Sequence, residues 1–371
     1  MKFVVSSTSL SQSLQAISKV IVAKNAMPIR ENILFEIEGT QLTLTASDED
    51  NTVKAKLSVN SADGDFAFTV PARHLIEIMG KFPEMPLTFD VSDLSKIQLI
   101  TENGKYQLVG TSADEYPQLK AMNDAASFTI SPDTLLRAVT KTVFAAADNE
   151  LRPIMNGICF VLSENGLVCA ATDSHQLVRF TNTATKGAEA TFVLPKKPAS
   201  ILKNVLPKEK EDVTVTFDEN SACFTLSSYT IVSRLIEGKY PNFNAVIPKE
   251  NPNRLTIDKS TLISAINRVA VCSNQASHLI KLDIKANEIV LSAQDYDFST
   301  FATETIACQY EGTPMPIGLK APFLVDILNN IDSSDVVLEL SDPSRAVLIL
   351  PFDNIEDEEI LMLLMPMTLG D

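Results

Sequence analysis

The sequence has no tryptophan, only three histidines and only 12 glycines among its 371 residues. So few histidines leave little material for histidine-based catalysis, and so few glycines argue against glycine-rich phosphate-binding loops. The five cysteines are scattered and never spaced C-x-x-C, which favours free thiols in a reducing cytoplasm over a disulfide framework or a zinc site. We therefore expect a cytoplasmic protein that binds neither a metal nor a cofactor.

Long apolar runs are also missing. No stretch of 18 apolar residues occurs, and the short apolar stretch near the N-terminus is too short for a signal peptide, so we expect no contact with a membrane. The residues are 45% hydrophobic and 21% charged, a balance that excludes a disordered chain and allows a large core. At about 150 residues per domain, the length predicts two to three domains.

The common catalytic motifs are absent as well. The chain lacks G-x-x-x-x-G-K-[ST], H-E-x-x-H and G-x-S-x-G. Asp173, Ser174 and His175 resemble triad material, but neighbouring residues on a strand point to opposite faces. Asp48, Asp173 and Asp295 recur at similar intervals without an aspartic-protease context, which favours a turn or cap at a strand end over catalysis. For the other histidines, His74 and His278, a surface position is the default.

Three segments share one pattern of alternating apolar residues. Counted back from Asp48, Asp173 and Asp295, the apolar positions fall at identical offsets. They are Ile33, Phe35, Ile37, Leu42, Leu44 and Ala46; Ile158, Phe160, Leu162, Leu167, Cys169 and Ala171; and Ile280, Leu282, Ile284, Ile289, Leu291 and Ala293. Two period-two runs joined by a polar turn predict a β-hairpin with one buried face. The pattern indicates a triplicated domain.

Each predicted hairpin is flanked by two amphipathic helix patterns, expected at residues 6–21, 72–82, 131–146, 196–210, 258–270 and 318–330. Ser-Pro-Asp at 131 and Asp-Lys-Ser at 258 suit helix N-termini. The expected fold class is α+β, with three repeated domains of one fold, each placing two helices against a β-rich layer. We expect boundaries in the polar, strand-poor stretches near 123 and 249, which gives domains 1–123, 124–249 and 250–371.

Charge is distributed unevenly between these elements. The net charge is −16, from 31 basic and 47 acidic residues, and taken alone it argues against nucleic acid. The six predicted helices nevertheless sum to +8, which leaves −24 on the remainder. If helix propensity alone placed Lys and Arg there, Glu would be equally frequent, yet only Glu77 and Glu209 occur. We interpret the helices as a basic surface for an anionic partner.

Two segments resemble a known family. ATDSHQLVRF (171–180) resembles the A-T-D-G-H-R-L signature of the bacterial sliding clamps, the beta subunits of DNA polymerase III. The terminal LMLLMPMTLGD resembles the M-P-M-x-L ending of that family. MPIRENILFEIEG (27–39) and KYPNFNAVIP (239–248) fall where the family has similar stretches, and the resemblance extends over the whole chain.

The resemblance implies a fold and a function. Such clamps are head-to-tail homodimers whose six domains close a ring, with twelve helices around the hole and continuous sheets outside. Double-stranded DNA passes through the hole without sequence readout, and the ring acts as a processivity factor. It tethers the replicative polymerase catalytic subunit, the clamp loader, other DNA polymerases and repair proteins, which bind through short linear motifs. Catalysis belongs to these partners, so we expect a non-catalytic subunit.

The resemblance also implies site residues. Candidates for DNA binding are Lys24, Arg73, Arg137, Arg152, Lys196, Lys197 and Arg268. The partner-peptide cleft corresponds to Met155, Thr172, His175, Leu177, Pro241, Val246, Leu363, Met365, Pro366 and Met367. The residue pattern supports that cleft independently of the resemblance, because three Met within 362–367 make an adaptable surface. Alternating Leu and Met also suit a core strand, so both interpretations stay open. The dimer interface is expected at Tyr106 and Leu108, opposite Val271 and Cys272.

Some positions depart from the family pattern. Ser174 stands for Gly, Gln176 and Ala245 each stand for Arg, and Gly370-Asp371 extends the usual end. These changes concern the polar rim of the cleft and its motif preference rather than its apolar floor. Two other functions stay open on the residues alone: a three-domain peptide-binding scaffold that never encircles DNA, and an enzyme that uses the repeated aspartates.

Overall fold

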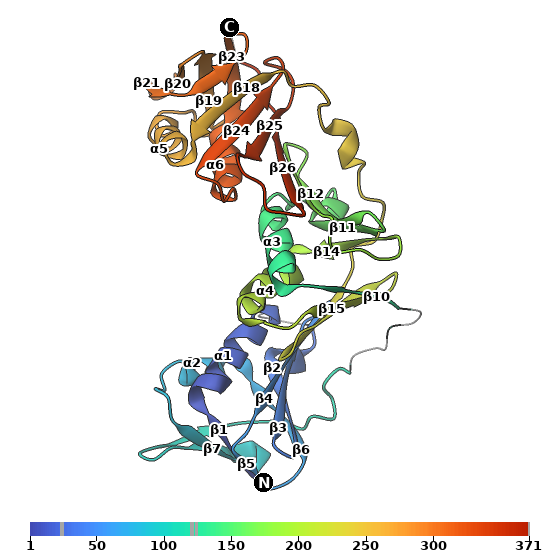
Figure 1. Ribbon diagram of the computed structural model, residues 1–371. Coiled ribbons are helices and arrows are strands. Elements are labelled where there is room, and N and C mark those ends of the chain that lie inside the picture. The colour runs from blue at the N-terminus through green and yellow to red at the C-terminus, as the bar shows by residue number, and fades with distance from the viewer. Residues whose placement is uncertain (23–25, 119–121, 123–124, 370–371) are drawn as a thin grey trace. The chain divides into compact units, whose positions relative to one another are not determined.

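The computed structural model describes residues 1–22, 26–118, 122 and 125–369 (Figure 1). The chain forms two compact units. The first combines Met1–Leu136 with Leu194–Ile236, and the second combines Arg137–Val193 with Glu237–Asp371. The middle third of the sequence therefore contributes strands to both units.

All six predicted helices are present, each somewhat shorter than its sequence pattern. They are α1 (Ser7–Ile17), α2 (Ala72–Met79), α3 (Pro132–Val143), α4 (Lys196–Val205), α5 (Lys259–Ala270) and α6 (Ala321–Asn329). The expected caps are confirmed, because the Ser131 hydroxyl accepts from Thr134 N (3.2 Å) and the Asp258 carboxylate accepts from Thr261 N (2.7 Å).

The first unit holds two antiparallel sheets. The smaller has the order β5 (Ser61–Ala62), β1 (Lys2–Ser6), β7 (Pro86–Asp90), β8 (Ile97–Ile100) and β9 (Lys105–Leu108). The larger has the order β10 (Ala126–Ile130), β15 (Val213–Phe217), β16 (Ser221–Thr225), β17 (Tyr229–Arg234), β4 (Asn51–Ser58), β3 (Gln41–Ser47), β2 (Asn32–Glu38) and β6 (Phe66–Pro71). Strand β9 is therefore a sheet edge.

Two further sheets belong to the second unit, apart from the last residues of β14. The larger has the order β14 (Ala190–Pro195), β11 (Gly157–Ser163), β12 (Gly166–Thr172), β13 (Gln176–Asn182), β26 (Glu358–Leu364), β25 (Val347–Pro351), β24 (Asp335–Leu340), β18 (Asn253–Asp258) and β22 (Gln309–Glu311). The smaller has the order β21 (Thr300–Ala307), β20 (Glu288–Asp295), β19 (Leu279–Lys285) and β23 (Met315–Lys320), so β21 is also an edge.

The three predicted hairpins are confirmed in equivalent registers. They are β2–β3, β11–β12 and β19–β20, and they pair Phe35 with Leu44, Phe160 with Cys169, and Leu282 with Leu291. The polar stretches expected to separate domains are less strand-poor than predicted, because β10 begins at Ala126 and β18 at Asn253. Alternation explains the first of these, since β10 exposes its polar residues and buries Phe128 and Ile130.

The recurrent aspartates close the turns that follow the second strand of each hairpin. Asp48 Oδ1 accepts from Asp50 N and Asn51 N, Asp173 Oδ1 from His175 N and Gln176 N, and Asp295 Oδ1 from Asp297 N and Phe298 N. These bonds run from 2.6 to 3.2 Å. The carboxylates thus satisfy backbone donors at strand ends, as the turn interpretation predicted, and each has the same structural role.

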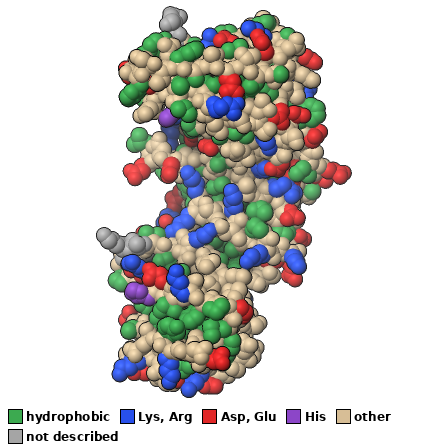
Figure 2. All heavy atoms as spheres, turned by 90° about the vertical axis from the view of Figure 1, so that its left-hand side faces the viewer, with side chains coloured by type: hydrophobic (Ala, Val, Ile, Leu, Met, Phe, Trp, Pro, Cys, Tyr) green, Lys and Arg blue, Asp and Glu red, His purple; other side chains and the backbone are tan. Residues whose placement is uncertain are grey.

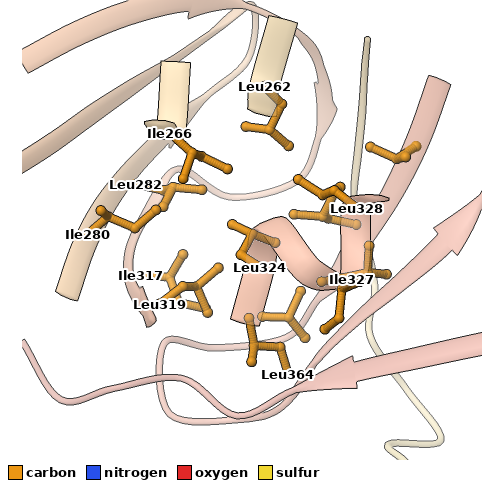
Figure 3. Close-up of a cluster of buried hydrophobic side chains, with 14 of the residues drawn as sticks. Leu262, Ile266, Ile280, Leu282, Ile317, Leu319, Leu324, Ile327, Leu328 and Leu364 are labelled. Atoms are coloured by element: carbon orange, nitrogen blue, oxygen red, sulfur yellow. The ribbon is translucent and has the colours of Figure 1, made fainter. Parts of the chain in front are cut away.

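The C-terminal repeat illustrates how the core is built (Figure 3). Leu262 and Ile266 of α5 and Leu324, Ile327 and Leu328 of α6 point toward side chains of β19 and β23, and all are fully buried. Each buried side chain of this size contributes about 1.5–3 kcal/mol. The two helices therefore cover one face of the four-stranded sheet, while their opposite faces stay exposed.

The five cysteines are free, as the sequence predicted. Cys159 and Cys169 are buried, and burial raises the pKa of the Cys159 thiol to about 12. Within the described part of the chain, no helix is long and apolar enough to cross a membrane.

Candidate nucleic-acid and partner-binding sites

Helix α4 carries three lysines, and Lys208 follows it directly. Lys203 and Lys208 are exposed, and Lys208 faces Lys19 and Gln12 across a groove of about 210 Å³ between α1 and α4. On the face shown in Figure 2, Lys and Arg side chains are numerous and are interspersed with carboxylates. Lys19, Lys203 and Lys208 were not among the predicted residues, although the +4 charge of segment 196–210 already contained two of them.

Several predicted DNA-binding residues form ion pairs with carboxylates of the same chain. Lys197 Nζ contacts Asp48 Oδ2 at 2.6 Å and also donates to the Val20 carbonyl. Arg73 and Glu77 form an exposed pair at 3.3 Å along α2. Arg268 of α5 forms a two-pronged pair with Glu304 of β21, and this hydrogen bonding lowers the pKa of Glu304. The helices are consequently less positive than their sequences indicated.

Arg137 is tied down most firmly among these residues. Its guanidinium donates to both carboxylate oxygens of Glu358 at 2.8 and 2.7 Å, and the Glu358 side chain is only 3% exposed. One turn later, buried Lys141 contacts Asp332 at 2.5 Å and the Asn330 carbonyl at 2.8 Å. Both cations fasten α3 to the C-terminal repeat, so Arg137 has a structural role that the sequence did not indicate.

We predict that Arg137→Gln destabilises the second unit by about 2 kcal/mol, because it leaves the Glu358 carboxylate buried without its partner. Urea unfolding followed by circular dichroism measures this effect. Arg73→Gln is the matched control, since it removes the same charge from an exposed pair and should cost at most about 0.5 kcal/mol. Equal effects of the two substitutions would show that the Arg137 pair adds no stability.

Three other predicted DNA-binding residues differ in their surroundings. Arg152 is exposed and donates to the Ser174 hydroxyl at 3.1 Å, which places it beside the predicted cleft rather than on a helix. Lys196 is half-buried at the start of α4. Lys24 lies outside the described residues.

The floor of the predicted peptide cleft forms in the second unit. Leu177 of β13 pairs with Leu363 of β26, and the two are 1% and 2% exposed. Ala346, Leu348 and Leu361 complete this cluster, and Phe243, Ile247 and Leu350 pack against it. Val246, in the same segment as Phe243, is 57% exposed, and Pro241 is exposed as well. The floor is thus partly covered by the chain's own 243–247 segment, which the sequence did not predict.

A second group of cleft residues surrounds the C-terminal tail. Met365 N donates to the His175 carbonyl at 2.8 Å, and Met367 N donates to the Gly318 carbonyl at the same distance. His175 also stacks on Phe323 of α6, with ring centroids 6.1 Å apart. Met365 is 41% exposed, whereas Pro366 and Met367 are half-buried. Phe323 was missed because an apolar residue on an amphipathic helix is ordinarily assigned to the core.

The turn before His175 is held by polar contacts. Ser174 has φ +82°, a conformation that favours glycine, and it occupies the position where the family signature has Gly. Thr172 N donates to the hydroxyl of buried Tyr240 at 3.1 Å, and burial raises the pKa of Tyr240 well above its usual value. Met155 is 5% exposed and its sulfur lies 3.9 Å from the Ser174 hydroxyl. Met155, Thr172 and His175 therefore meet around one turn.

The predicted dimer residues lie at or beside two sheet edges. Tyr106 of β9 is 41% exposed and packs edge-on against Phe82, with ring centroids 5.3 Å apart. Leu108 is only 6% exposed, so its side chain already belongs to the core of its own unit, which differs from the expectation that it faces a partner. Val271 is 82% exposed at the end of α5, and the Cys272 carbonyl accepts from Thr300 of edge strand β21 at 3.4 Å.

Family comparisons identify all three repeats. Residues 1–120 match the DNA polymerase III beta subunit N-terminal domain, residues 129–242 its central domain, and residues 244–368 its C-terminal domain. The predicted α+β fold with three clamp domains is thereby confirmed. The three matches come from three separate family descriptions, so the triplication seen in the hairpin pattern corresponds to recognised domains.

Whole-chain comparisons agree with these matches. The beta sliding clamp of Pseudomonas putida is 26% identical over 98% of this chain and 99% of that protein, and that of Synechococcus elongatus is 27% identical over the full length of both. Among solved structures, the DNA polymerase III beta subunits of Bartonella birtlesii and Pseudomonas aeruginosa, both bound to griselimycin, are 28% and 25% identical. Their TM-scores are 0.92 and 0.93, with complete coverage of both chains. The chain belongs to the family of DNA polymerase III beta subunits, the beta sliding clamps, which are the non-catalytic processivity factors of that polymerase.

Proposed function

We propose that two copies of this chain close head to tail into a ring that encircles double-stranded DNA. The observation that carries this proposal is a strand pairing that occurs twice within the chain. Strand β4 of the first repeat pairs with β17 of the second, with Val53 opposite Ile231. Strand β13 of the second repeat pairs in the same way with β26 of the third, with Val178 opposite Met362.

The third pairing of this series is not formed within a single chain, because its two strands, β21 and β9, are both sheet edges. Strand β21 of the third repeat is the equivalent of β4 and β13, because Ala302 lies opposite Ala293 as Val53 lies opposite Ala46. Strand β9 of the first repeat is the equivalent of β17 and β26, because Tyr106 pairs with Leu99 as Ile231 pairs with Phe224. Both are sheet edges, and an edge presents unpaired backbone groups to a neighbouring strand.

A second copy can complete the series. Adding β9 of one copy to β21 of the other, in the register of the β4–β17 and β13–β26 pairings, would place Tyr106 opposite Ala302. Ile231 and Met362, the equivalents of Tyr106, are fully buried, whereas Tyr106 is 41% exposed in the single chain. A head-to-tail pair repeats this contact twice and so closes upon itself.

In this ring the helices would carry the DNA-facing charge. Lys203, Lys208 and Lys19 are exposed on or beside α4 and α1 and can approach phosphates without sequence readout. Arg73, Lys197 and Arg268 contribute less positive potential than free cations would, because each is paired with a carboxylate. A weakly positive lining suits sliding, because the closed ring rather than tight contacts retains the DNA.

The cleft around Leu177, Leu363 and Met365 would bind partner proteins through short linear motifs. The polymerase catalytic subunit, the clamp loader, other DNA polymerases and repair proteins are the proposed partners. We place the domain boundaries at 1–123, 124–249 and 250–371. The family match that ends at residue 120 supports the first boundary, whereas the C-terminal match already begins at residue 244. A cytoplasmic location is consistent with five free cysteines.

Topology distinguishes the ring from a scaffold that only binds peptides. We predict that the protein, loaded by its clamp loader onto nicked circular duplex DNA, co-elutes with that DNA on gel filtration at moderate salt. Cutting the circle with a restriction enzyme should release most of the protein, because a ring slides off free ends. Retention that is equal on circular and linear DNA would contradict encirclement, and absence from both would favour the scaffold.

A further inference from the structure

The sequence contains three Asn-Gly dipeptides, and the structure places one of them in an open turn. Asn103 is exposed between β8 and β9, and the carbonyl of the following Gly104 accepts from Thr101 N at 2.9 Å. Among the residues that the structure describes, no hydrogen-bond partner is found for the Asn103 side chain or for the Gly104 amide. These two groups are therefore free to approach each other.

The dipeptides that begin at Asn156 and Asn165 are held more firmly. The Asn156 side chain accepts from Asn149 N at 3.0 Å and donates to the Asn149 carbonyl at 3.1 Å. Gly166, which follows Asn165, belongs to β12, and a Cβ added there would lie 2.5 Å from the Asn182 carbonyl oxygen. The main chain at Gly166 is thus closely packed. Rearrangement at either dipeptide requires local opening of the fold.

Free asparagine before glycine undergoes a known reaction of the main chain. The Gly104 nitrogen can attack the Asn103 side-chain carbonyl carbon, because glycine has no Cβ to obstruct the approach. A C–N bond forms to give a cyclic imide, and the bond to the side-chain nitrogen breaks. Ammonia leaves with the proton of the Gly104 amide. Water then opens the imide at either carbonyl and gives aspartate or isoaspartate, and no oxidant or reductant takes part.

Tyr106 packs directly on the glycine of this dipeptide. A Cβ added at Gly104 would lie 3.2 Å from Tyr106 Cε2 and 3.3 Å from the Tyr106 hydroxyl. Isoaspartate routes the main chain through the Asn103 Cβ atom and so lengthens it immediately before Gly104. The contact of Gly104 with the Tyr106 ring must then shift, and Tyr106 is the residue proposed to face β21 of a second copy.

Asn103 would stay accessible in a closed ring. Its equivalents in the β4–β17 and β13–β26 pairings, counted from Ile231 and Met362, are Ser228 and Glu359. Both equivalents are exposed although they adjoin a formed strand pairing. Closure of the ring therefore leaves the turn open to water.

We propose that Asn103 is a site of spontaneous deamidation and that its conversion to isoaspartate weakens closure of the ring. The first part depends only on the turn between β8 and β9. The second part rests on the proposed contact of β9 with β21. Age would then limit the time for which a copy of this chain can form a stable ring.

The modification is tested on the full-length protein, incubated in mildly alkaline buffer and sampled over time. After digestion in acid, mass spectrometry separates the amide from the acid at each site, and an isoaspartate methyltransferase labels the isomerised product. Asn103 should react at least about tenfold faster than Asn156, which must first break two hydrogen bonds. In urea the three sites should react at similar rates, since Gly follows each Asn. Equal rates in the folded protein would overturn the assignment of Asn103.

The effect on the ring is tested with the same samples. Fluorescence-detected sedimentation should show that the dimer dissociation constant of isoaspartate-containing protein rises by about tenfold or more, as for loss of one buried side-chain contact. Asn103→Gln keeps the amide but reacts far more slowly, so its dimer should resist ageing. Asn103→Asp adds the charge without lengthening the main chain and should remain dimeric.

The outcomes separate the two parts of the proposal. Complete deamidation at Asn103 with an unchanged dissociation constant would overturn the effect on closure. Dissociation of fresh Asn103→Asp protein would show that charge, rather than the lengthened main chain, opens the contact. Fresh, unmodified protein that is monomeric at micromolar concentration would overturn the ring itself and with it the second part, whereas the reactivity of Asn103 would still be measured.

Discussion

Tyr106→Asp is expected to convert the ring of about 81 kDa into single chains of 40.5 kDa. The substitution introduces a carboxylate at Tyr106. Its equivalents in the β4–β17 and β13–β26 pairings, Ile231 and Met362, are fully buried. Burying an unpaired charge costs several kcal/mol, and the ring contains the contact twice. Even about 3 kcal/mol per contact amounts to more than a hundredfold in each association constant. Sedimentation velocity at micromolar concentration measures the change.

Two further variants make this result specific. Ala302→Asp changes the other side of the same contact and should also produce single chains. Gln98→Asp adds the same charge to β8, where Gln98 is exposed and its neighbours Ile97 and Leu99 are buried, and should leave the dimer intact. Circular dichroism checks that each variant is folded. A folded Tyr106→Asp protein that still sediments as a dimer would refute the β9–β21 contact.

The local elements were predictable because each depends on neighbours in sequence. The period-two runs from Ile33, Ile158 and Ile280 allow one register only, since a slip by one residue would expose the apolar face. The turn role of Asp48, Asp173 and Asp295 followed from their position at strand ends. These features need no knowledge of distant residues, and the structure confirms them.

Charges were less predictable because their partners are far away in the chain. Arg137 pairs with Glu358, and Lys197 pairs with Asp48. Summing charge over helical segments counts all such cations as available and cannot see these carboxylates. The same reasoning applies to Phe323, because its contact with His175 depends on a turn that lies far from α6 in the sequence.

The dimer contact stays a prediction, but its two β9 residues differ in exposure. Alternation correctly assigns Tyr106 and Leu108 to one strand face, but exposure depends on what packs against each residue. Tyr106 lies toward Phe82 and remains 41% exposed, whereas Leu108 is covered within its own unit. The strand pairing shows that β9 corresponds to β17 and β26, and this correspondence identifies Tyr106 as the equivalent of the buried Ile231. The sequence alone does not reveal that correspondence.

Deleting residues 365–371 is expected to weaken the binding of cleft peptides at least tenfold while the ring still closes on DNA. The deletion removes Met365 and Met367, whose backbone amides hold the tail against the His175 and Gly318 carbonyls. Each Met that the peptide would fully cover contributes about 1.5–3 kcal/mol to the free energy of peptide binding, and the deletion removes this contribution. Part of the loss is offset, because binding no longer has to order these side chains. Affinity should fall by tenfold or more, which fluorescence anisotropy measures.

A shorter deletion, of residues 368–371, is the matched control, because it keeps Met365, Pro366 and Met367 in place. It should bind peptide nearly as well as the full chain. Both deletions spare the exposed Lys19, Lys203 and Lys208 and both sheet edges β9 and β21, so both proteins should sediment as dimers and remain on circular DNA. If the longer deletion lost peptide binding and dimerisation together, the tail would be part of the structural core. If it bound peptide normally, the apolar anchors of the partner would have to lie away from Met365, and the cleft would have to be sought elsewhere.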